Sequence, residues 1–130
     1  MNQTSKIMDN KLTFKKAVFI FLIVFVIILI FTFIDYLVHL LSEEYAVSSY
    51  YYRNKIIFGT GIGFVVYLFV GKKKLFVKSL IFSAVISILL QTRYFLEGYS
   101  LEFVFEFLLF HFLMLVPVSL LFFWLFRNKI

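Results

Sequence analysis

The sequence predicts an all-α integral membrane protein, with four transmembrane helices in an antiparallel bundle and both termini in the cytoplasm. Three observations support this fold class. Hydrophobic residues make up 63% of the 130 residues, they fall into runs long enough to cross a bilayer, and most basic residues lie in alternate connections between the runs. A chain of this length has room for one domain, so residues 1–130 are expected to form a single membrane domain.

The first apolar run defines the first predicted helix. A polar, basic leader at residues 1–16 precedes it, and between Ala17 and Ile34 the only polar residue is Thr32. Such a run is longer than the apolar region of a signal peptide, which has about 7 to 15 residues. We therefore expect a retained membrane-spanning helix over residues 17–41.

Three further apolar runs predict helices over residues 55–71, 75–96 and 101–126. The first of these three is short for a hydrocarbon core about 30 Å thick. Arg53 and Lys55 stand at its outer end. Long basic side chains at such positions extend toward the interface, so we expect both to snorkel into the polar region.

The distribution of basic residues predicts the topology. Ten of the thirteen Lys and Arg residues lie in the leader, in the turn between the second and third helices and in the C-terminal tail; the others are Arg53, Lys55 and Arg93. Because basic residues mark the cytoplasmic side, both termini are expected inside, and the plasma membrane is the expected location. The lysines are not interleaved with stacking aromatics as a nucleic-acid site requires, so their expected partner is the lipid bilayer.

Small residues predict where the helices pack. Gly59 and Gly63 form a GxxxG pair on the second helix, and the third helix carries a stripe at four-residue spacing. Close approach through small residues is typical of membrane helices, so these two stripes are expected to face each other; they would equally suit a homodimer. The stripe on the third helix comprises Ser79, Ser83 and Ser87.

Polar residues on three helices come out at similar depths near the outer end of the bundle, so antiparallel packing could oppose Asp35 to Glu106 and His39 to Glu102. Asp35 and His39 lie one turn apart on the first helix, and Glu102 and Glu106 one turn apart on the fourth. Counted from the helix ends, Asp35 is about 9 Å deep and Glu106 about 8 Å, and ionisable residues inside a span point to function by default. The candidate outer polar cluster comprises Asp35, His39, Gln91, Arg93, Glu102 and Glu106.

Three roles are open for this cluster. In the first, Arg93 neutralises Asp35 or Glu106 in an ion-pair cluster that fixes the helix register near the interface. In the second, Asp35 or Glu106 binds a cation or a proton on a pathway through the membrane. In the third, a divalent metal is bound by oxygen and imidazole ligands that suit Zn, Mn or Fe. The ligands of that metal hypothesis are Asp35, His39, Glu102 and Glu106.

His111 is treated separately because it lies near the membrane midplane. It is turned by about 180° from Glu102 and 140° from Glu106 on the same helix, so it is not expected to join their site. Two roles are open for it: a neutral histidine hydrogen-bonded to a neighbouring helix, or a proton relay.

No catalytic motif stands out, there are no cysteines, and the parts outside the helices are too short to form a domain. The expected function is therefore a non-catalytic subunit or assembly partner of a membrane complex, and no cofactor is predicted. Two alternatives stay open: a small oligomeric transporter or channel that uses Asp35 or Glu106, and a metal-dependent membrane enzyme with an outward-facing site.

Overall fold

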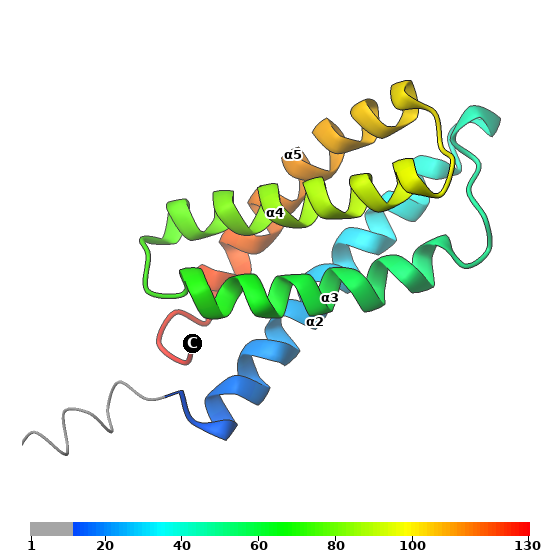
Figure 1. The fold of residues 1–130 in the computed structure, drawn as a ribbon. Coiled ribbons are helices and arrows are strands. Elements are labelled where there is room, and N and C mark those ends of the chain that lie inside the picture. The colour runs from blue at the N-terminus through cyan, green and yellow to red at the C-terminus, as the bar shows by residue number, and fades with distance from the viewer. Residues whose placement is uncertain (1–11) are drawn as a thin grey trace, which may run out of the picture.

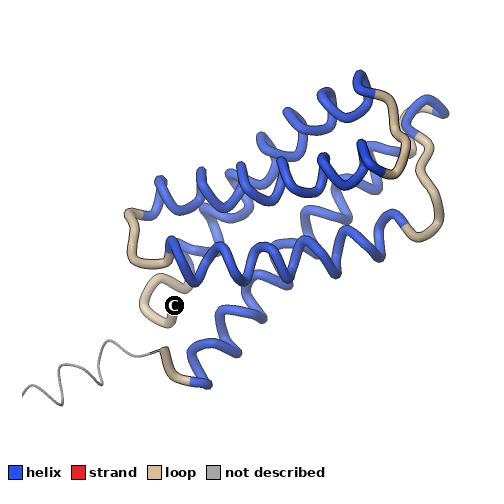
Figure 2. Tube along the Cα trace, in the orientation of Figure 1, coloured by secondary structure: helices blue, strands red, loops and turns tan. Residues whose placement is uncertain are grey.

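The computed structural model describes residues 12–130, and this part of the chain is all-helical (Figures 1 and 2). Most of the predicted leader, residues 1–11, lies outside the described residues. Each of the four α-helices is long and apolar enough to cross a membrane, which confirms the four predicted spans at this level. The elements are α2 (Phe14–His39), the short 3-10 helix η1 (Glu43–Tyr45), α3 (Tyr51–Val70), α4 (Leu75–Leu96) and α5 (Leu101–Leu125).

The four helices form a bundle in which each one packs on two neighbours. Successive helices contact each other, and α5 closes the bundle by packing against α2. In Figure 1 the α2–α3 and α4–α5 connections lie together at one end, which we call the loop end (residues 40–50 and 97–100). The α3–α4 turn, the start of α2 and the C-terminus lie at the opposite end, which we call the lysine end (residues 12–16, 71–74 and 126–130).

Local sequence signals account for several helix boundaries. The Thr13 side chain accepts a hydrogen bond from the backbone N–H of Lys16 at the start of α2, and Ser100 caps α5 in the same way by accepting from Phe103. Gly98 follows α4 with φ +102°, a left-handed conformation that glycine adopts without a steric penalty.

The structure corrects the predicted start of the second helix. α3 begins at Tyr51, four residues before the predicted Lys55, and its 20 residues are enough for about 30 Å. Tyr51 and Tyr52, which precede the predicted start, lie in its first turn. Lys55 therefore lies in the second turn of α3, and it is fully buried rather than snorkelling at the surface.

The glycine stripe of α3 allows close approach to two helices. A Cβ on Gly59 would lie 3.2 Å from Ile28 Cγ2 of α2. A Cβ on Gly63 would lie 2.8 Å from Val24 Cγ1 of α2 and 3.0 Å from Phe82 Cε2 of α4. The stripe therefore contacts α2 as closely as α4, whereas the prediction placed it against the third helix or a second copy of the chain.

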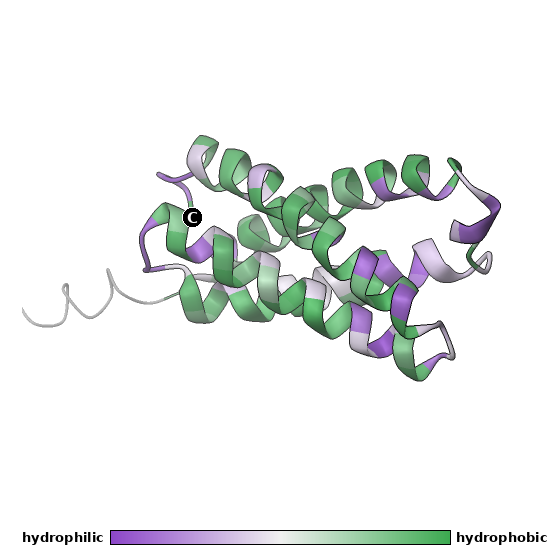
Figure 3. Ribbon diagram, turned by 90° about the horizontal axis from the view of Figure 1, so that it is seen from above, coloured by the Kyte–Doolittle hydropathy of each residue, from purple (hydrophilic) through white to green (hydrophobic). Residues whose placement is uncertain are grey.

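The serine stripe of α4 faces the interior of the bundle but does not pack against the glycine stripe of α3. Ser79, Ser83 and Ser87 are fully buried, and Ser83 Oγ lies 3.4 Å from Ser119 Oγ of α5. Phe82, which is also fully buried, fills the contact with Gly63. Phe82, and not a serine, thus meets Gly63, while the adjacent Ser83 faces α5. Figure 3 shows hydrophobic residues along all four helices and hydrophilic residues gathering toward the two ends.

Candidate functional site

A buried ion pair between α2 and α3 forms the centre of the candidate site. Lys55 Nζ contacts the Asp35 carboxylate, and both side chains have 0% exposure. An isolated charge in the bundle interior would cost several kcal/mol, whereas two opposite charges in direct contact offset much of that cost. Asp35 is one of the predicted site residues, and Lys55 takes the place that was assigned to Arg93.

Two histidines flank the carboxylate. His111 Nε2 of α5 lies 3.1 Å from Asp35 Oδ1 and 3.0 Å from Lys55 Nζ. Neutral imidazole carries one hydrogen, so Nε2 either donates to the carboxylate or accepts from the ammonium. His39 Nε2 lies 3.3 Å from Asp35 Oδ2 on its other side. The structure thus brings the midplane histidine into the charged cluster, and it keeps His39 beside Asp35 as the four-residue spacing predicts.

Aromatic side chains complete the surroundings of the lysine. Lys55 Nζ donates to Tyr51 Oη at 2.9 Å and lies 4.4 Å from the centre of the same ring. It also lies 5.1 Å from the ring of Phe31 and 5.6 Å from that of Tyr94, distances at which a cation is attracted to an aromatic face. With Tyr94, α4 contributes as well, so all four helices meet at this point. We call the group the Asp35 cluster: Asp35, His39, Tyr51, Lys55, Tyr94 and His111.

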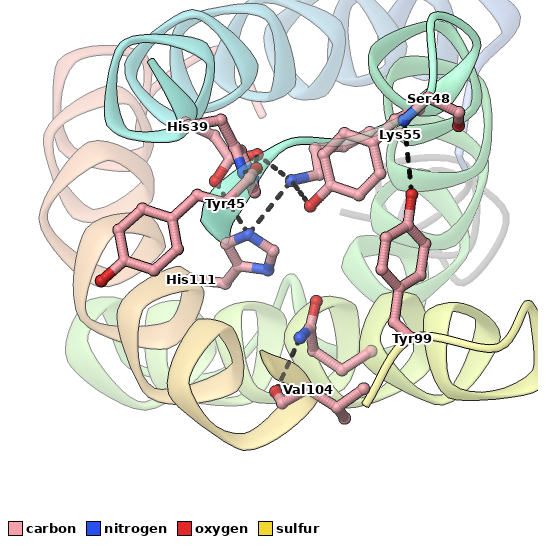
Figure 4. A network of polar contacts seen from close by, with 10 residues as sticks. His39, Tyr45, Ser48, Lys55, Tyr99, Val104 and His111 are labelled. Atoms are coloured by element: carbon pink, nitrogen blue, oxygen red, sulfur yellow. Dashed lines mark hydrogen bonds and ion pairs between the residues drawn. The ribbon is translucent and has the colours of Figure 1, made fainter. Parts of the chain in front are cut away.

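His39 connects the Asp35 cluster to the loop end. Its Nδ1 lies 2.5 Å from the backbone carbonyl of Tyr45 in η1, to which it donates, and its ring stacks on Phe107 with centroids 4.4 Å apart. With Nδ1 donating to the carbonyl, Nε2 carries a hydrogen toward Asp35 only in the cationic imidazolium. Figure 4 shows His39 and Tyr45 side by side, with Lys55 and His111 pointing toward each other next to them.

Gln91 and Arg93 of α4 lie apart from the ion pair. Gln91 is buried, and its Nε2 donates to the Val104 carbonyl of α5 at 2.7 Å. Arg93 Nε pairs with Glu97 Oε1 at 3.1 Å on a partly exposed face and covers the ring of Phe58 at 3.9 Å. The hypothesis that Arg93 neutralises Asp35 or Glu106 is therefore wrong. The two residues are about 200° apart on the helix, so an inward Gln91 turns Arg93 outward.

Glu102 and Glu106 lie on the outer surface of α5. Both are exposed, neither forms an ion pair within residues 12–130, and they line an open groove together with Glu44 and Tyr45. The angle from His111 explains this placement, because an inward His111 turns both glutamates away from the interior. Asp35 and Glu106 therefore do not meet, which settles a contact that the sequence leaves open.

The four residues of the metal hypothesis are thus divided between the interior and the surface. Asp35 and His39 are buried, whereas Glu102 and Glu106 are exposed. Within the described part of the chain, no group of three or more His, Cys, Asp or Glu side chains is arranged to hold a metal ion. Lys55 Nζ contacts Oδ2 of the Asp35 carboxylate, an oxygen that a metal ion at this site would otherwise contact.

Two cluster residues that the sequence-based prediction missed, Tyr51 and Lys55, share one signal. Tyr51, Lys55, Gly59, Gly63 and Tyr67 are spaced by four residues along α3, and all five are buried. The GxxxG pair already marks this stripe as a packing face. Extending the stripe from Gly59 by one four-residue step toward the N-terminus places Lys55 on the interior face, and a second step places Tyr51 there.

A second buried lysine lies near the lysine end. Lys78 of α4 is 7% exposed, and its Nζ donates to Tyr67 Oη at 3.1 Å and to the Gly71 carbonyl at 3.4 Å. The ammonium also lies 5.6 Å from the ring of Phe123. Unlike Lys55, Lys78 forms no ion pair with a carboxylate of the described residues.

Comparisons with family models, with curated proteins and with solved structures found no match to this chain.

The chemistry of the Asp35 cluster follows from its geometry. The ammonium and the two imidazoles each lie within hydrogen-bonding or ion-pairing distance of the Asp35 carboxylate, and the four groups are closed off from solvent. Such a group can hold helices in register, and it can move a proton between neighbouring nitrogen and oxygen atoms. A solute larger than a proton cannot reach Asp35 in this conformation, because the side chain has no exposed surface.

Proposed function

We propose that the chain is a four-span protein of the plasma membrane with both termini in the cytoplasm, and that it serves as a non-catalytic subunit or assembly partner of a membrane complex. The charge distribution supports this orientation. Within the described residues, the acidic side chains all lie toward the loop end, while the lysine end carries lysines from three segments. Basic segments of membrane proteins stay on the cytoplasmic side.

The observation that carries the assembly role is the position of Glu106. This carboxylate is exposed in the second turn of α5, and its neighbours Phe105 and Leu109 are each 62% exposed. It also lines a groove with the apolar side chains Val38 and Phe110. A carboxylate on an apolar face at this depth is costly when it faces lipid, and a cationic or hydrogen-bonding group on a partner helix would offset the cost.

The Asp35 cluster supports the same role from the inside. Its carboxylate and ammonium neutralise each other, and its members come from all four helices. Buried polar groups of this kind serve best to specify one arrangement of helices. On this proposal the cluster fixes the bundle, and the outer face around Glu106 docks the partner.

Site-directed cross-linking in native membranes tests the proposal, because the chain has no cysteine to interfere. A cysteine replacing Leu109, next to Glu106, should give a cross-link to a different polypeptide. A cysteine replacing Leu68, an exposed position on α3, should give none. Adding Glu106→Gln should weaken the first cross-link. If neither position gave a cross-link, or if Leu109→Cys cross-linked only to a second copy of the chain, the result would contradict the partner role.

The fully buried ion pair favours a second candidate, a proton pathway through the Asp35 cluster. A proton needs no cavity, and His39 joins the carboxylate to the loop end. The test is proton flux into liposomes that contain the purified protein and an enclosed pH-sensitive dye. Asp35→Asn should abolish the flux, whereas Glu97→Gln on the surface should not. Wild-type flux equal to that of empty liposomes would exclude this candidate.

A further inference from the structure

The start of α2 and the C-terminal tail form a basic groove at the lysine end. The groove has a volume of about 390 Å³, and it lies between segments that are more than 100 residues apart in the sequence. In Figure 1 the C-terminus turns back beside the start of α2 and the end of α3. The lining residues are Thr13, Lys15, Lys16, Phe19 and Lys129.

Backbone hydrogen bonds and aromatic packing give this groove a defined shape. The tail folds back after α5, because the N–H groups of Lys129 and Ile130 donate to the Phe126 carbonyl at 2.9 and 3.2 Å. Phe126 then packs edge-on against Phe19 of α2, with ring centroids 5.7 Å apart. Lys129 Nζ comes to lie 5.7 Å from the centre of the Phe19 ring. The Lys129 ammonium therefore lies beside an aromatic ring that lines the groove.

The groove has positive charge without a counter-ion in the described part of the protein. Lys15, Lys16 and Lys129 are exposed, and none of them forms an ion pair there. Asp9 lies outside the described residues. The acidic side chains of residues 12–130 all belong to the loop half of the bundle: Asp35, Glu43, Glu44, Glu97, Glu102 and Glu106.

An apolar surface continues from the groove along α2. Val18, Phe21 and Leu22 are 41%, 43% and 52% exposed, and they follow Lys15 and Lys16 within about two turns of α2. A ligand that fits both parts carries a negative charge and a hydrocarbon chain. A soluble anion would meet the ammonium groups but would leave the apolar surface uncovered.

We propose that this groove binds the head group of an anionic phospholipid, with its phosphate between Lys16 and Lys129 and its acyl chains along the exposed face of α2. The lipid supplies the counter-charge that the lysine end lacks. Basic pockets at helix ends recognise lipid head groups in this way, and each lysine near the surface strengthens binding by about fivefold.

Native mass spectrometry of the full chain in mild detergent tests the proposal. The protein is titrated with phosphatidylglycerol and, separately, with phosphatidylcholine of the same acyl chains. We expect one phosphatidylglycerol to bind per chain in preference to phosphatidylcholine. The double variant Lys16→Gln/Lys129→Gln should lose this preference by about tenfold or more, since two lysines at about fivefold each are removed.

The matched control is Lys72→Gln/Lys73→Gln, which removes the same charge at the same end but outside the groove. This control should keep the preference for phosphatidylglycerol. Equal losses in the two double variants would mean a diffuse basic surface and would overturn the site, as would equal binding of the two lipids by the wild type. Circular dichroism melting of both variants verifies that neither loses binding by unfolding.

Discussion

Lys55 of α3 contacts Asp35 of α2 in the interior of the bundle, and neither side chain has any exposed surface. The contact joins the first two helices about one and a half turns from the loop end. His111 of α5 lies within 3.1 Å of both partners, so the pair also connects these helices to the last one. Because each charge depends on the other, the cluster favours one helix register over its alternatives.

Removing one member of this pair should destabilise the bundle strongly. Asp35→Asn leaves the Lys55 ammonium buried without its counter-ion, and such a change costs about 3–5 kcal/mol. The measurement is the free energy of unfolding in mixed micelles. Glu97→Gln is the matched control: it removes the carboxylate of the partly exposed Arg93–Glu97 pair and should cost at most about 1 kcal/mol.

The double variant Asp35→Asn/Lys55→Met distinguishes pairing from simple loss of packing. With both charges gone, the stability should recover in part relative to Asp35→Asn alone, since no isolated charge is left in the interior. If the double variant lost more stability than the sum of the losses in Asp35→Asn and Lys55→Met, the ion pair would not be the dominant interaction of the Asp35 cluster.

The two buried lysines should respond differently to the same substitution. Lys55→Met leaves the Asp35 carboxylate buried alone and should cost about 3–5 kcal/mol. Lys78→Met leaves only the phenol of Tyr67 and the Gly71 carbonyl without a donor, and methionine keeps most of the packing. We expect this second change to cost no more than about 1–3 kcal/mol, measured in the same unfolding assay. If Lys78→Met lost more stability than Lys55→Met, the result would contradict the conclusion that the contact with Asp35 sets the cost of removing Lys55.

Two glycines of α3 provide a test of the helix packing. A Cβ on Gly63 would lie 2.8 Å from Val24 Cγ1, and valine has little freedom to move away, so Gly63→Ala should destabilise by about 1–3 kcal/mol. A Cβ on Gly61 meets nothing within 4 Å. Because alanine favours a helix over glycine by about 1 kcal/mol, Gly61→Ala should be neutral or stabilising. Equal effects of the two changes would mean that α3 does not pack on α2 through Gly63.

The helices themselves could be predicted closely from the sequence. Long apolar runs with few polar residues are typical of membrane-spanning helices. The third and fourth helices begin at the predicted residues. The start of α3 could not be read in this way. Tyrosines, Arg53 and Lys55 are also typical of the interface, so composition alone does not separate a loop from the first turn of a helix.

The start of α3 determines which basic residue is expected beside Asp35. A helix that begins at Lys55 puts this lysine at the interface, which leaves Arg93 as the basic residue near the depth of Asp35 and the glutamates of α5 as the acids at a similar depth. Which face of α5 turns inward depends on packing across the whole bundle, and the period of an apolar helix gives little sign of it. The relative angles of His111 and Glu106 were nevertheless correct, since they follow from helix geometry alone.

Cysteine accessibility gives a direct test of the proposed orientation, since the chain has no cysteine of its own. Ser49 is exposed at the loop end, and Lys73 is exposed in the turn at the lysine end. With the lysine end in the cytoplasm, a membrane-impermeant maleimide should label Ser49→Cys on intact cells and should label Lys73→Cys only after permeabilisation. The reverse pattern would invert the protein and place the acidic residues of the loop end in the cytoplasm. Labelling of both variants on intact cells would mean that the two ends do not lie on opposite sides of a membrane, and the four-span arrangement would have to be abandoned.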